Sequence, residues 1–187
     1  MRLFVAIPLA EEVRAHLVAV QERLQTSGAD IKWVEPENLH LTVSFLGDQQ
    51  ESLLPDLEAV WESVVAETYA FRIGVRGGSA FPKRGPTVKT LWVGVTEGAD
   101  AWKELVRRAE SLLLPFGVPR EGGLMPHVTL GRVRNEAHME ALRAALAAEA
   151  QTDCGGQAAD RLELIQSTLD PRGATYETLR TWQLQER

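Results

Sequence analysis

Cysteine is almost absent from this chain of 187 residues, in which Cys154 is the single one. A lone thiol excludes an intrachain disulfide, a cysteine-rich zinc site and a Cys-x-x-Cys redox pair. The sequence therefore gives no sign of an oxidising compartment, and we expect a protein of the cytoplasm.

Long apolar runs are absent as well. No stretch approaches the roughly 20 apolar residues that a membrane span requires. The apolar run at residues 3–7 ends at Pro8, and the charged residues Glu11 and Glu12 follow, so the longer core of a signal peptide is missing. We expect neither export nor insertion into a membrane.

An excess of positive charge is the third absence. Lys and Arg number 20 against 26 Asp and Glu, which gives a formal net charge of −6. That balance disfavours a protein that coats nucleic acid without specificity, but it is compatible with a small anionic ligand in a locally basic cleft. The 44% hydrophobic and 25% charged fractions are those of an ordinary globular domain.

The order of predicted elements in the first half of the chain recurs in the second half. Each half predicts a short apolar strand, an amphipathic helix and, after a break, a strand with His at or near its start. These elements are residues 3–7, 10–24 and 40–47 in the first half and 91–95, 100–114 and 126–131 in the second. Leu3 lies 37 residues before His40 and Leu91 lies 36 before His127, so the spacing repeats too.

The repeat continues downstream, with helices predicted at 53–66 and 137–150 and strands at 71–75 and 162–165. A unit of about 90 residues is too long for a solenoid repeat. An internal duplication explains it better.

We therefore predict an α+β fold in a single bilobal domain over residues 1–187, with a first unit at about 1–85 and a second at about 88–187. Each of two pseudo-symmetric lobes would hold a mostly antiparallel sheet with helices on the outer face, and the active-site cleft would lie between the lobes. A further strand at 176–184 fits the sheet of either lobe.

The two His-x-Thr strands carry the candidate site. Side chains alternate along a strand, so His40, Thr42 and Ser44 are expected on one face, with Leu41, Val43 and Phe45 on the other. The same rule places His127 beside Thr129. If a pseudo-twofold axis relates the lobes, both polar faces line one cleft, which is a favoured place for a small ligand.

Two facing histidines suit displacement at phosphorus. Imidazole titrates near neutrality, so one ring can accept a proton while the other donates one. Threonine hydroxyls can donate hydrogen bonds to the non-bridging oxygens as charge develops on them. We therefore predict His40 and His127 as the catalytic pair and Thr42 and Thr129 as substrate-binding residues, with no metal and no cofactor.

Other residues are weaker candidates. Arg132 follows the second motif and can bind phosphate bidentately, but strict alternation turns it away from His127 unless Gly131 breaks the pleat. The loop residues Lys83 and Arg84, with Lys89, form either a basic rim for RNA or a solvated hairpin tip. Candidates for stacking on a base occur among Trp33, Phe45, Phe81 and Trp92, although most of these are expected in the core.

Two other chemistries are disfavoured. Zinc normally takes at least three protein ligands, and neither motif brings a neighbouring Cys or a His at helical spacing. Ser44 has no triad-like pattern around it, so a polar strand residue is the better interpretation than a nucleophile. His16 and His138 lie in predicted helices without a partner motif and are expected at the surface.

The motifs at residues 40–43 and 127–130 resemble the paired H-x-T-x signatures of the two-histidine phosphoesterase superfamily. Within it, residues 2–7, 40–47 and 126–130 are similar to the RNA 2′,3′-cyclic phosphodiesterases, historically called 2′-5′ RNA ligases. The resemblance covers nearly the whole chain. Two copies of the motif in equivalent positions make it far more specific than one.

The resemblance implies opening of a terminal 2′,3′-cyclic phosphate to a 2′-phosphomonoester, with a capacity for 2′-5′ joining in reverse. It also implies that His40 donates a proton to the departing 3′-oxygen and that His127 activates water. The expected partner is an RNA end, such as a tRNA fragment. No protein partner is implied, and we expect a monomer.

Two alternatives remain open at this point. The substrate could be a small nucleotide, such as a cyclic phosphate of ADP-ribose, or a 2′-5′ oligonucleotide. A non-catalytic nucleotide-binding module would keep the cleft without turnover, but a pure binder has no need of a paired proton donor and acceptor.

Overall fold

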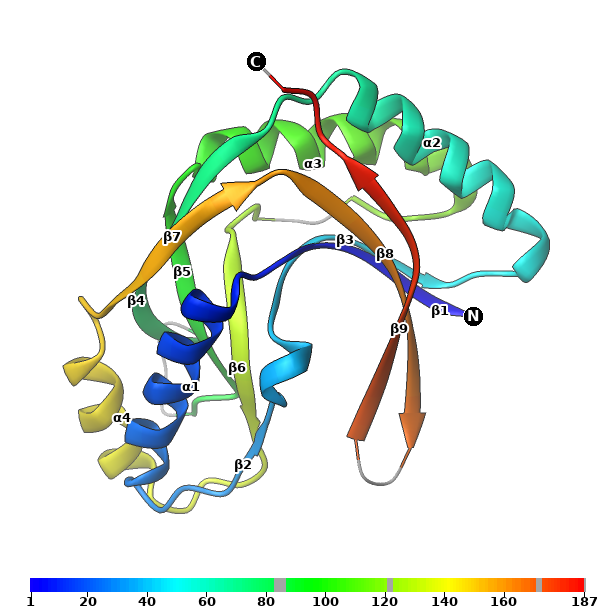
Figure 1. Ribbon diagram of the computed structural model, residues 1–187. Helices are drawn as coiled ribbons and strands as arrows, with labels where there is room; N and C mark the ends of the chain where they lie inside the picture. The colour runs from blue at the N-terminus through cyan, green and yellow to red at the C-terminus, as the bar shows by residue number, and fades with distance from the viewer. Residues whose placement is uncertain (83–86, 121–122, 171–172, 187) are drawn as a thin grey trace.

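Two twisted antiparallel sheets make up the centre of the computed structural model, which describes residues 1–82, 87–120, 123–170 and 173–186 (Figure 1). Sheet A has the order β3-β1-β8-β9 and consists of β1 (Arg2–Pro8), β3 (His40–Asp48), β8 (Arg161–Asp170) and β9 (Gly173–Gln183). Sheet B has the order β2-β6-β5-β4-β7 and consists of β2 (Ile31–Trp33), β4 (Phe71–Phe81), β5 (Thr90–Glu97), β6 (His127–Val133) and β7 (Asp153–Ala159).

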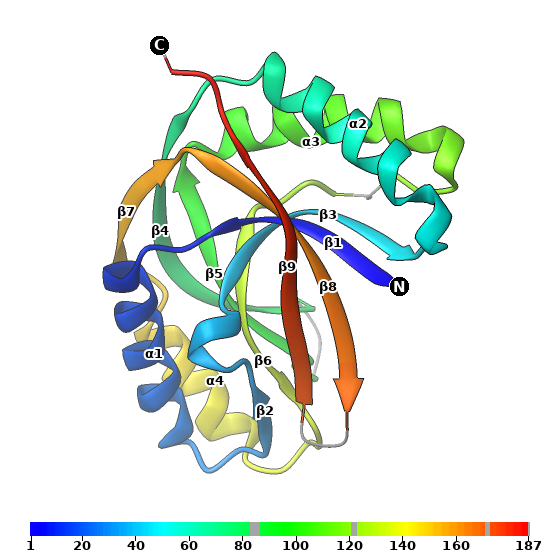
Figure 2. The same cartoon turned by 45° about the vertical axis from the view of Figure 1, so that its right-hand side comes forward.

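Each sheet carries a pair of helices. The α-helices are α1 (Glu11–Gln25), α2 (Leu54–Ala66), α3 (Ala99–Leu113) and α4 (Met139–Ala148). Helices α1 and α4 contact each other and sheet B, whereas α2 and α3 contact each other and sheet A (Figures 1 and 2). Short 3₁₀ turns lie at Pro36–Asn38, Glu51–Leu53 and Leu114–Phe116. None of the helices in the described ranges is long and apolar enough to cross a membrane.

Strand β1 is apolar from Leu3 to Ile7 because both of its faces are covered there. Leu3, Val5 and Ile7 belong to the main core beneath the helices, whereas Phe4 and Ala6 form a smaller cluster on the opposite face of sheet A. A strand buried on both faces reads as a continuous apolar run instead of an alternating one.

The predicted α+β fold with two antiparallel lobes is confirmed, but the spatial lobes draw on both halves of the chain. Strand β4 of the first half lies in sheet B beside β5, and β8 of the second half lies in sheet A beside β1. Helices α1 and α3 likewise pack on the sheet that does not contain the strand before them. The two sequence units at about 1–85 and 88–187 therefore remain a prediction about ancestry and are not the boundaries of the lobes.

The order of three strands in each sheet agrees with the predicted repeat. If β1 corresponds to β5, β3 to β6 and β4 to β8, the order β3-β1-β8 of sheet A becomes β6-β5-β4 of sheet B. The outer strands β9 and β7 both come from the second half of the chain, so the repeat does not relate them. The strand expected at 176–184 overlaps β9, which ends at Gln183 and pairs with β8, so it belongs to sheet A.

Candidate active site

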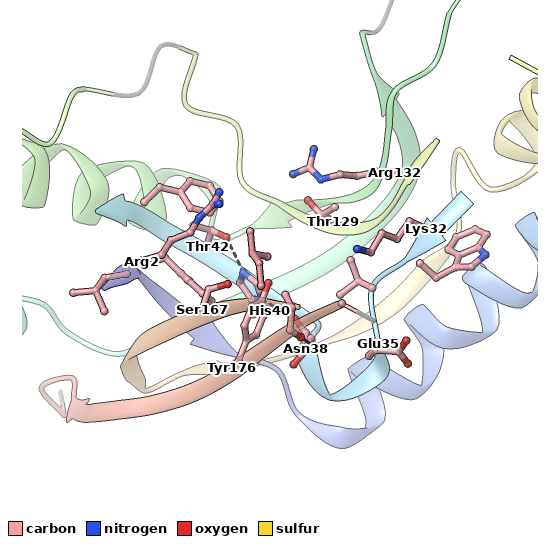
Figure 3. A pocket seen from close by; sticks show the side chains of 18 of the residues that line it. Arg2, Lys32, Glu35, Asn38, His40, Thr42, Thr129, Arg132, Ser167 and Tyr176 are labelled. Atoms are coloured by element: carbon pink, nitrogen blue, oxygen red, sulfur yellow. Dashed lines mark hydrogen bonds between the residues drawn. The ribbon is translucent and has the colours of Figure 1, made fainter. Parts of the chain in front are cut away.

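The two His-x-Thr strands meet where the sheets adjoin. Strands β3 and β6 contact each other, and each begins with its histidine. A cleft of about 580 Å³ lies at this junction and is lined by residues from both sheets (Figure 3). Its volume falls within the range of sites that hold small organic ligands.

Four of the five predicted site residues line this cleft, namely His40, Thr42, Thr129 and Arg132. His127 is not among the lining residues. It begins the strand that carries Thr129 and Arg132, and its charge acts on His40. The structure thus brings the two motifs to adjoining strands, with residues of both lining one cleft.

Each imidazole is held by a backbone carbonyl two residues before it. The Nδ1 of His40 lies 2.7 Å from the Asn38 carbonyl oxygen, and the Nδ1 of His127 lies 2.8 Å from that of Met125. A carbonyl oxygen only accepts, so Nδ1 carries the hydrogen in both rings. The proton that each ring exchanges is therefore at Nε2.

The hydroxyl of Thr42 lies 3.0 Å from Nε2 of His40. When the ring is neutral Nε2 accepts this hydrogen bond, and when the ring is protonated Nε2 donates it. Trp102 of α3 donates from Nε1 to the backbone carbonyl of Thr42 at 3.1 Å, which fixes the strand at this point. Nε2 of His40 and the Thr42 hydroxyl thus lie within hydrogen-bond distance of each other.

Burial lowers the pKa of His40, because the charged imidazolium loses solvation. The hydrogen bond to the Asn38 carbonyl opposes this, and the charge of His127 adds to the lowering. Each histidine also contacts two aromatic rings. His40 stacks on Phe4 at 4.8 Å and meets Tyr176 edge-on at 5.7 Å.

On the other strand, His127 contacts Phe81 at 5.2 Å and Trp92 at 5.8 Å, measured between ring centroids. Phe81 and Trp92 also stack on each other at 4.9 Å. Phe81 and Trp92, two of the four aromatic residues considered for stacking on a base, thus pack against the imidazole of His127. Packing of this kind restricts rotation of the two imidazole rings.

A β-bulge interrupts each His-x-Thr strand directly after the threonine. In β3, Ala6 pairs with Thr42 and Val5 with Ser44, so Val43 is the extra residue. In β6, Trp92 pairs with Thr129 and Leu91 with Gly131, so Leu130 is the extra residue. A bulge shifts the alternation of side chains by one residue.

The bulge in β6 brings Arg132 into the cleft. Leu130 and Gly131 are both buried, and Arg132 then faces the same side as Thr129. The sequence placed Arg132 beside the site only if the strand alternation was broken before it. The bulge provides this break, although the extra residue is Leu130 and not Gly131.

The bulge in β3 corrects the prediction for two residues. Ser44 is 5% exposed and pairs with the core residue Val5, so it lies away from His40. Phe45, expected on the core face, is 56% exposed and lines the cleft. Phe45 and Arg132 therefore occupy equivalent positions, each five residues after its histidine.

Positive charge gathers in the cleft despite the net charge of the chain. Arg2, Lys32, Arg132 and Arg134 line it together with one carboxylate, Glu35. Burial raises the pKa of Tyr176, and the charges of Arg132 and Arg2 oppose that rise. Arginines from both sheets thus act on one phenol, which marks the middle of the cleft as favourable for an anion.

Comparison with known proteins gives the family. A family model described as LigT like Phosphoesterase matches residues 7–92. An RNA 2′,3′-cyclic phosphodiesterase of Methanothermobacter thermautotrophicus is 30% identical over 184 residues, which cover 98% of this chain and 99% of the relative. A protein of the same name from Archaeoglobus fulgidus is 33% identical over 187 residues, with 98% and 100% covered. The chain belongs to the LigT-like phosphoesterase family.

Solved structures agree. TT0787 of Thermus thermophilus superposes with a TM-score of 0.84 at 29% identity, covering 98% of both chains. The structure of E. coli LigT complexed with 3′-AMP gives a TM-score of 0.77 at 21% identity, covering 98% of this chain and 97% of that one, and it supports the fold. The superfamily resemblance of the sequence is thereby confirmed.

The site of this LigT-like phosphoesterase contains residues that the sequence did not reveal. Arg2 and Phe4 looked like parts of an ordinary strand, and Tyr176 lies far along the chain in β9. Asn38 supplies the carbonyl for His40 and donates from its side chain to Ala174 at 3.1 Å, tying His40 to the β8–β9 hairpin.

Gln21 is a further residue whose role the pattern of polar and apolar residues did not reveal. It is 4% exposed on the apolar face of α1, and its Nε2 donates to the carbonyls of Val34 and Leu130, both at 2.9 Å. The backbone N–H of Val34 donates to the same Leu130 carbonyl at 2.9 Å. Gln21 therefore holds the bulge that turns Arg132 into the cleft. A polar residue on the apolar face of a predicted helix was the available signal.

Among the remaining candidates, Trp33 also lines the cleft. His16 and His138 are exposed, as expected. Within the described ranges, no three or more His, Cys, Asp or Glu side chains are grouped so that they could hold a metal ion. Lys83 and Arg84 lie outside the described residues.

Proposed function

We propose that this protein hydrolyses 2′,3′-cyclic phosphates at RNA ends to 2′-phosphomonoesters by acid/base catalysis, without a metal or another cofactor, as a cytoplasmic monomer. The support that carries the proposal is the duplicated geometry of the imidazoles. Each ring donates from Nδ1 to a carbonyl and so keeps Nε2 for proton transfer. The names of the curated relatives point to the same substrate.

In the proposed reaction, His127 takes a proton from water as the water oxygen bonds to phosphorus. The bond from phosphorus to the 3′-oxygen breaks, and His40 gives its Nε2 proton to that oxygen. The assignment of acid and base rests on the family resemblance, because the two motifs are nearly symmetric. The same steps in the same direction, with a 5′-hydroxyl end of RNA in place of water as the nucleophile, would give 2′-5′ ligation.

Thr42 and Thr129 hold the non-bridging oxygens in this scheme, and Arg132 contributes positive charge to the substrate site. The lowered pKa of His40 keeps its ring neutral in the free protein at neutral pH. A bound phosphate favours the imidazolium, so substrate binding itself would charge the acid.

The test uses an oligonucleotide that ends in a 2′,3′-cyclic phosphate, incubated with protein that has been treated with EDTA. The proposal requires a 2′-phosphomonoester as the product, identified against synthetic 2′- and 3′-phosphate standards. A 3′-phosphate product, or activity that returns only with added metal, would contradict the mechanism. Tight binding without any turnover would leave a nucleotide-binding module.

A further inference from the structure

Two cations face each other across neighbouring strands of sheet B. Lys32 of β2 is the direct register partner of Arg132 of β6, and both side chains line the cleft. Figure 3 shows both extending toward the side where Thr129 and His40 lie. Like charges directly opposite on antiparallel strands destabilise a sheet.

Neither cation is neutralised within the described part of the chain. Arg132 has a hydrogen bond from its guanidinium to the Thr90 hydroxyl at 3.4 Å, which brings no negative charge. The neighbouring Arg134, by contrast, forms an ion pair with Asp30 at 3.7 Å. The carboxylate of Glu35 points away from the Lys32 ammonium (Figure 3). An anion between Lys32 and Arg132 would relieve their repulsion.

Lys32 and Arg132 are paired further along sheet B than the start of β6, where His127 lies. Arg132 is five residues beyond His127, which is roughly 16 Å of extended strand before the shortening by the bulge. Long side chains recover part of that distance, and Thr129 lies between. An anion held by Lys32 is therefore not the phosphate between the imidazoles, but one carried elsewhere on the same ligand.

We propose that Lys32 and Arg132 form a second phosphate site, which binds the 5′-phosphate of the nucleotide whose 2′,3′-cyclic phosphate is opened. The inference rests on the proposed function and narrows it. The substrate is a nucleotide phosphorylated on both sides of the ribose, as at the end of an RNA chain, and a nucleoside 2′,3′-cyclic phosphate lacks one of the two contacts.

The experiment compares adenosine 2′,3′-cyclic phosphate with the same compound carrying a 5′-phosphate. The wild-type protein should show a higher kcat/KM for the 5′-phosphorylated compound. Lys32→Met removes the charge and keeps the chain length, and it should reduce this preference by about three- to tenfold, mainly through KM. Lys32→Arg should restore it, and added salt should weaken it in the wild type.

Lys103→Met is the matched control, because it removes the same charge from helix α3, where Lys103 pairs with Asp100 at 3.3 Å. It should leave the preference unchanged. An unchanged preference in Lys32→Met, or an equal loss on both compounds, would overturn the second site.

Calorimetry separates this inference from the proposed function. Binding of adenosine 5′-phosphate and of adenosine is measured with the wild type and with Lys32→Met, and neither ligand is turned over. The 5′-phosphate is expected to make adenosine 5′-phosphate bind more tightly than adenosine. Loss of this difference in affinity in Lys32→Met supports the site even if no cyclic phosphate is hydrolysed. The absence of any such difference in a hydrolytically active wild type refutes the site alone.

Discussion

The two walls of the cleft are alike at their centre and different at their rim. On each wall a strand begins with His, places Thr two residues later and bulges at the next residue. On each wall the imidazole is held by the carbonyl two residues before it. The fifth residue after each histidine then differs, being Phe45 on sheet A and Arg132 on sheet B.

In the proposed function, the similar centre would serve the proton transfers and the different rim residues would orient the ligand. A symmetric centre suits two proton transfers that are mirror images of each other at one phosphorus. An asymmetric rim gives the ligand a direction, because an exposed aromatic ring favours a flat base and a guanidinium favours a phosphate. Phe4 and Tyr176 extend the aromatic wall, and Lys32 and Arg134 extend the basic one.

The largest expected effect comes from breaking the symmetric centre. His40→Ala and His127→Ala should each lower kcat by about 10²–10⁴-fold, the usual contribution of one general acid or base. Because the two rings act in one step, the double variant should lose little more than the worse single variant. Single-turnover kinetics with parallel binding measurements test this. A loss below tenfold in either variant would remove that ring from the reaction.

The next effect comes from the rim. Arg132→Ala should weaken substrate binding by about 10- to 100-fold, since a hydrogen bond to a charged group contributes about 1.5–3 kcal/mol. Phe45→Ala should weaken it by a similar or smaller factor through lost stacking, about 1–3 kcal/mol per base. Titrations at several salt concentrations separate the two, because only the Arg132 contribution should shrink with ionic strength. Equal salt dependence would argue against distinct roles.

A smaller effect is expected from Gln21, which lies beneath the cleft residues and holds the bulge in β6. Gln21→Leu leaves the Val34 carbonyl without its donor and should lower the free energy of unfolding by about 1–3 kcal/mol. It should also reduce kcat/KM by freeing the Leu130 bulge, but not in an Arg132→Ala background. Trp102→Phe, which removes the hydrogen bond to Thr42 on the other wall, is the matched control and should keep its effect in that background. Additive losses for Gln21 and Arg132 would show that Gln21 stabilises the fold without positioning the arginine.

The smallest effect is a pH dependence of stability. The pKa of His40 is lowered in the folded protein, so the unfolded chain binds its proton more readily. The contribution of His40 to stability is therefore complete above the unfolded pKa, about 6.5, and is lost as pH falls from there through the folded pKa. Urea unfolding of wild type and His40→Gln at pH 7.5 and 5.5 should show a smaller drop in the variant. An equal drop would place the proton-linked loss elsewhere.

The sequence predicted the elements and four residues that line the cleft, because both follow local patterns. Apolar periodicity located the strands and helices, and the repeated His-x-Thr spacing paired residues 87 positions apart, His40 and His127. The faces of Ser44 and Phe45 were predicted wrongly, because a bulge adds one residue to a strand without leaving a sign in the pattern of polar and apolar residues.

Long-range partners were hidden for a different reason. Tyr176 and Arg2 reach the cleft because β9 and β1 lie in one sheet with β8 between them. The order of strands in a sheet cannot be predicted from the pattern of neighbouring residues in the sequence. The exchange of β4 and β8 between the lobes is equally non-local. It was missed because units that succeed each other in sequence were taken to be neighbours in space.

That exchange has a mechanical consequence. A single residue, Asp160, separates β7 in one sheet from β8 in the other, and the ribbon that they form arches from lobe to lobe (Figure 1). The chain crosses between the two sheets at several points, so any movement of one lobe relative to the other must be accommodated in the connections, of which Asp160 is the shortest. We therefore expect the substrate of the proposed reaction to enter the cleft without a large hinge movement of the two lobes.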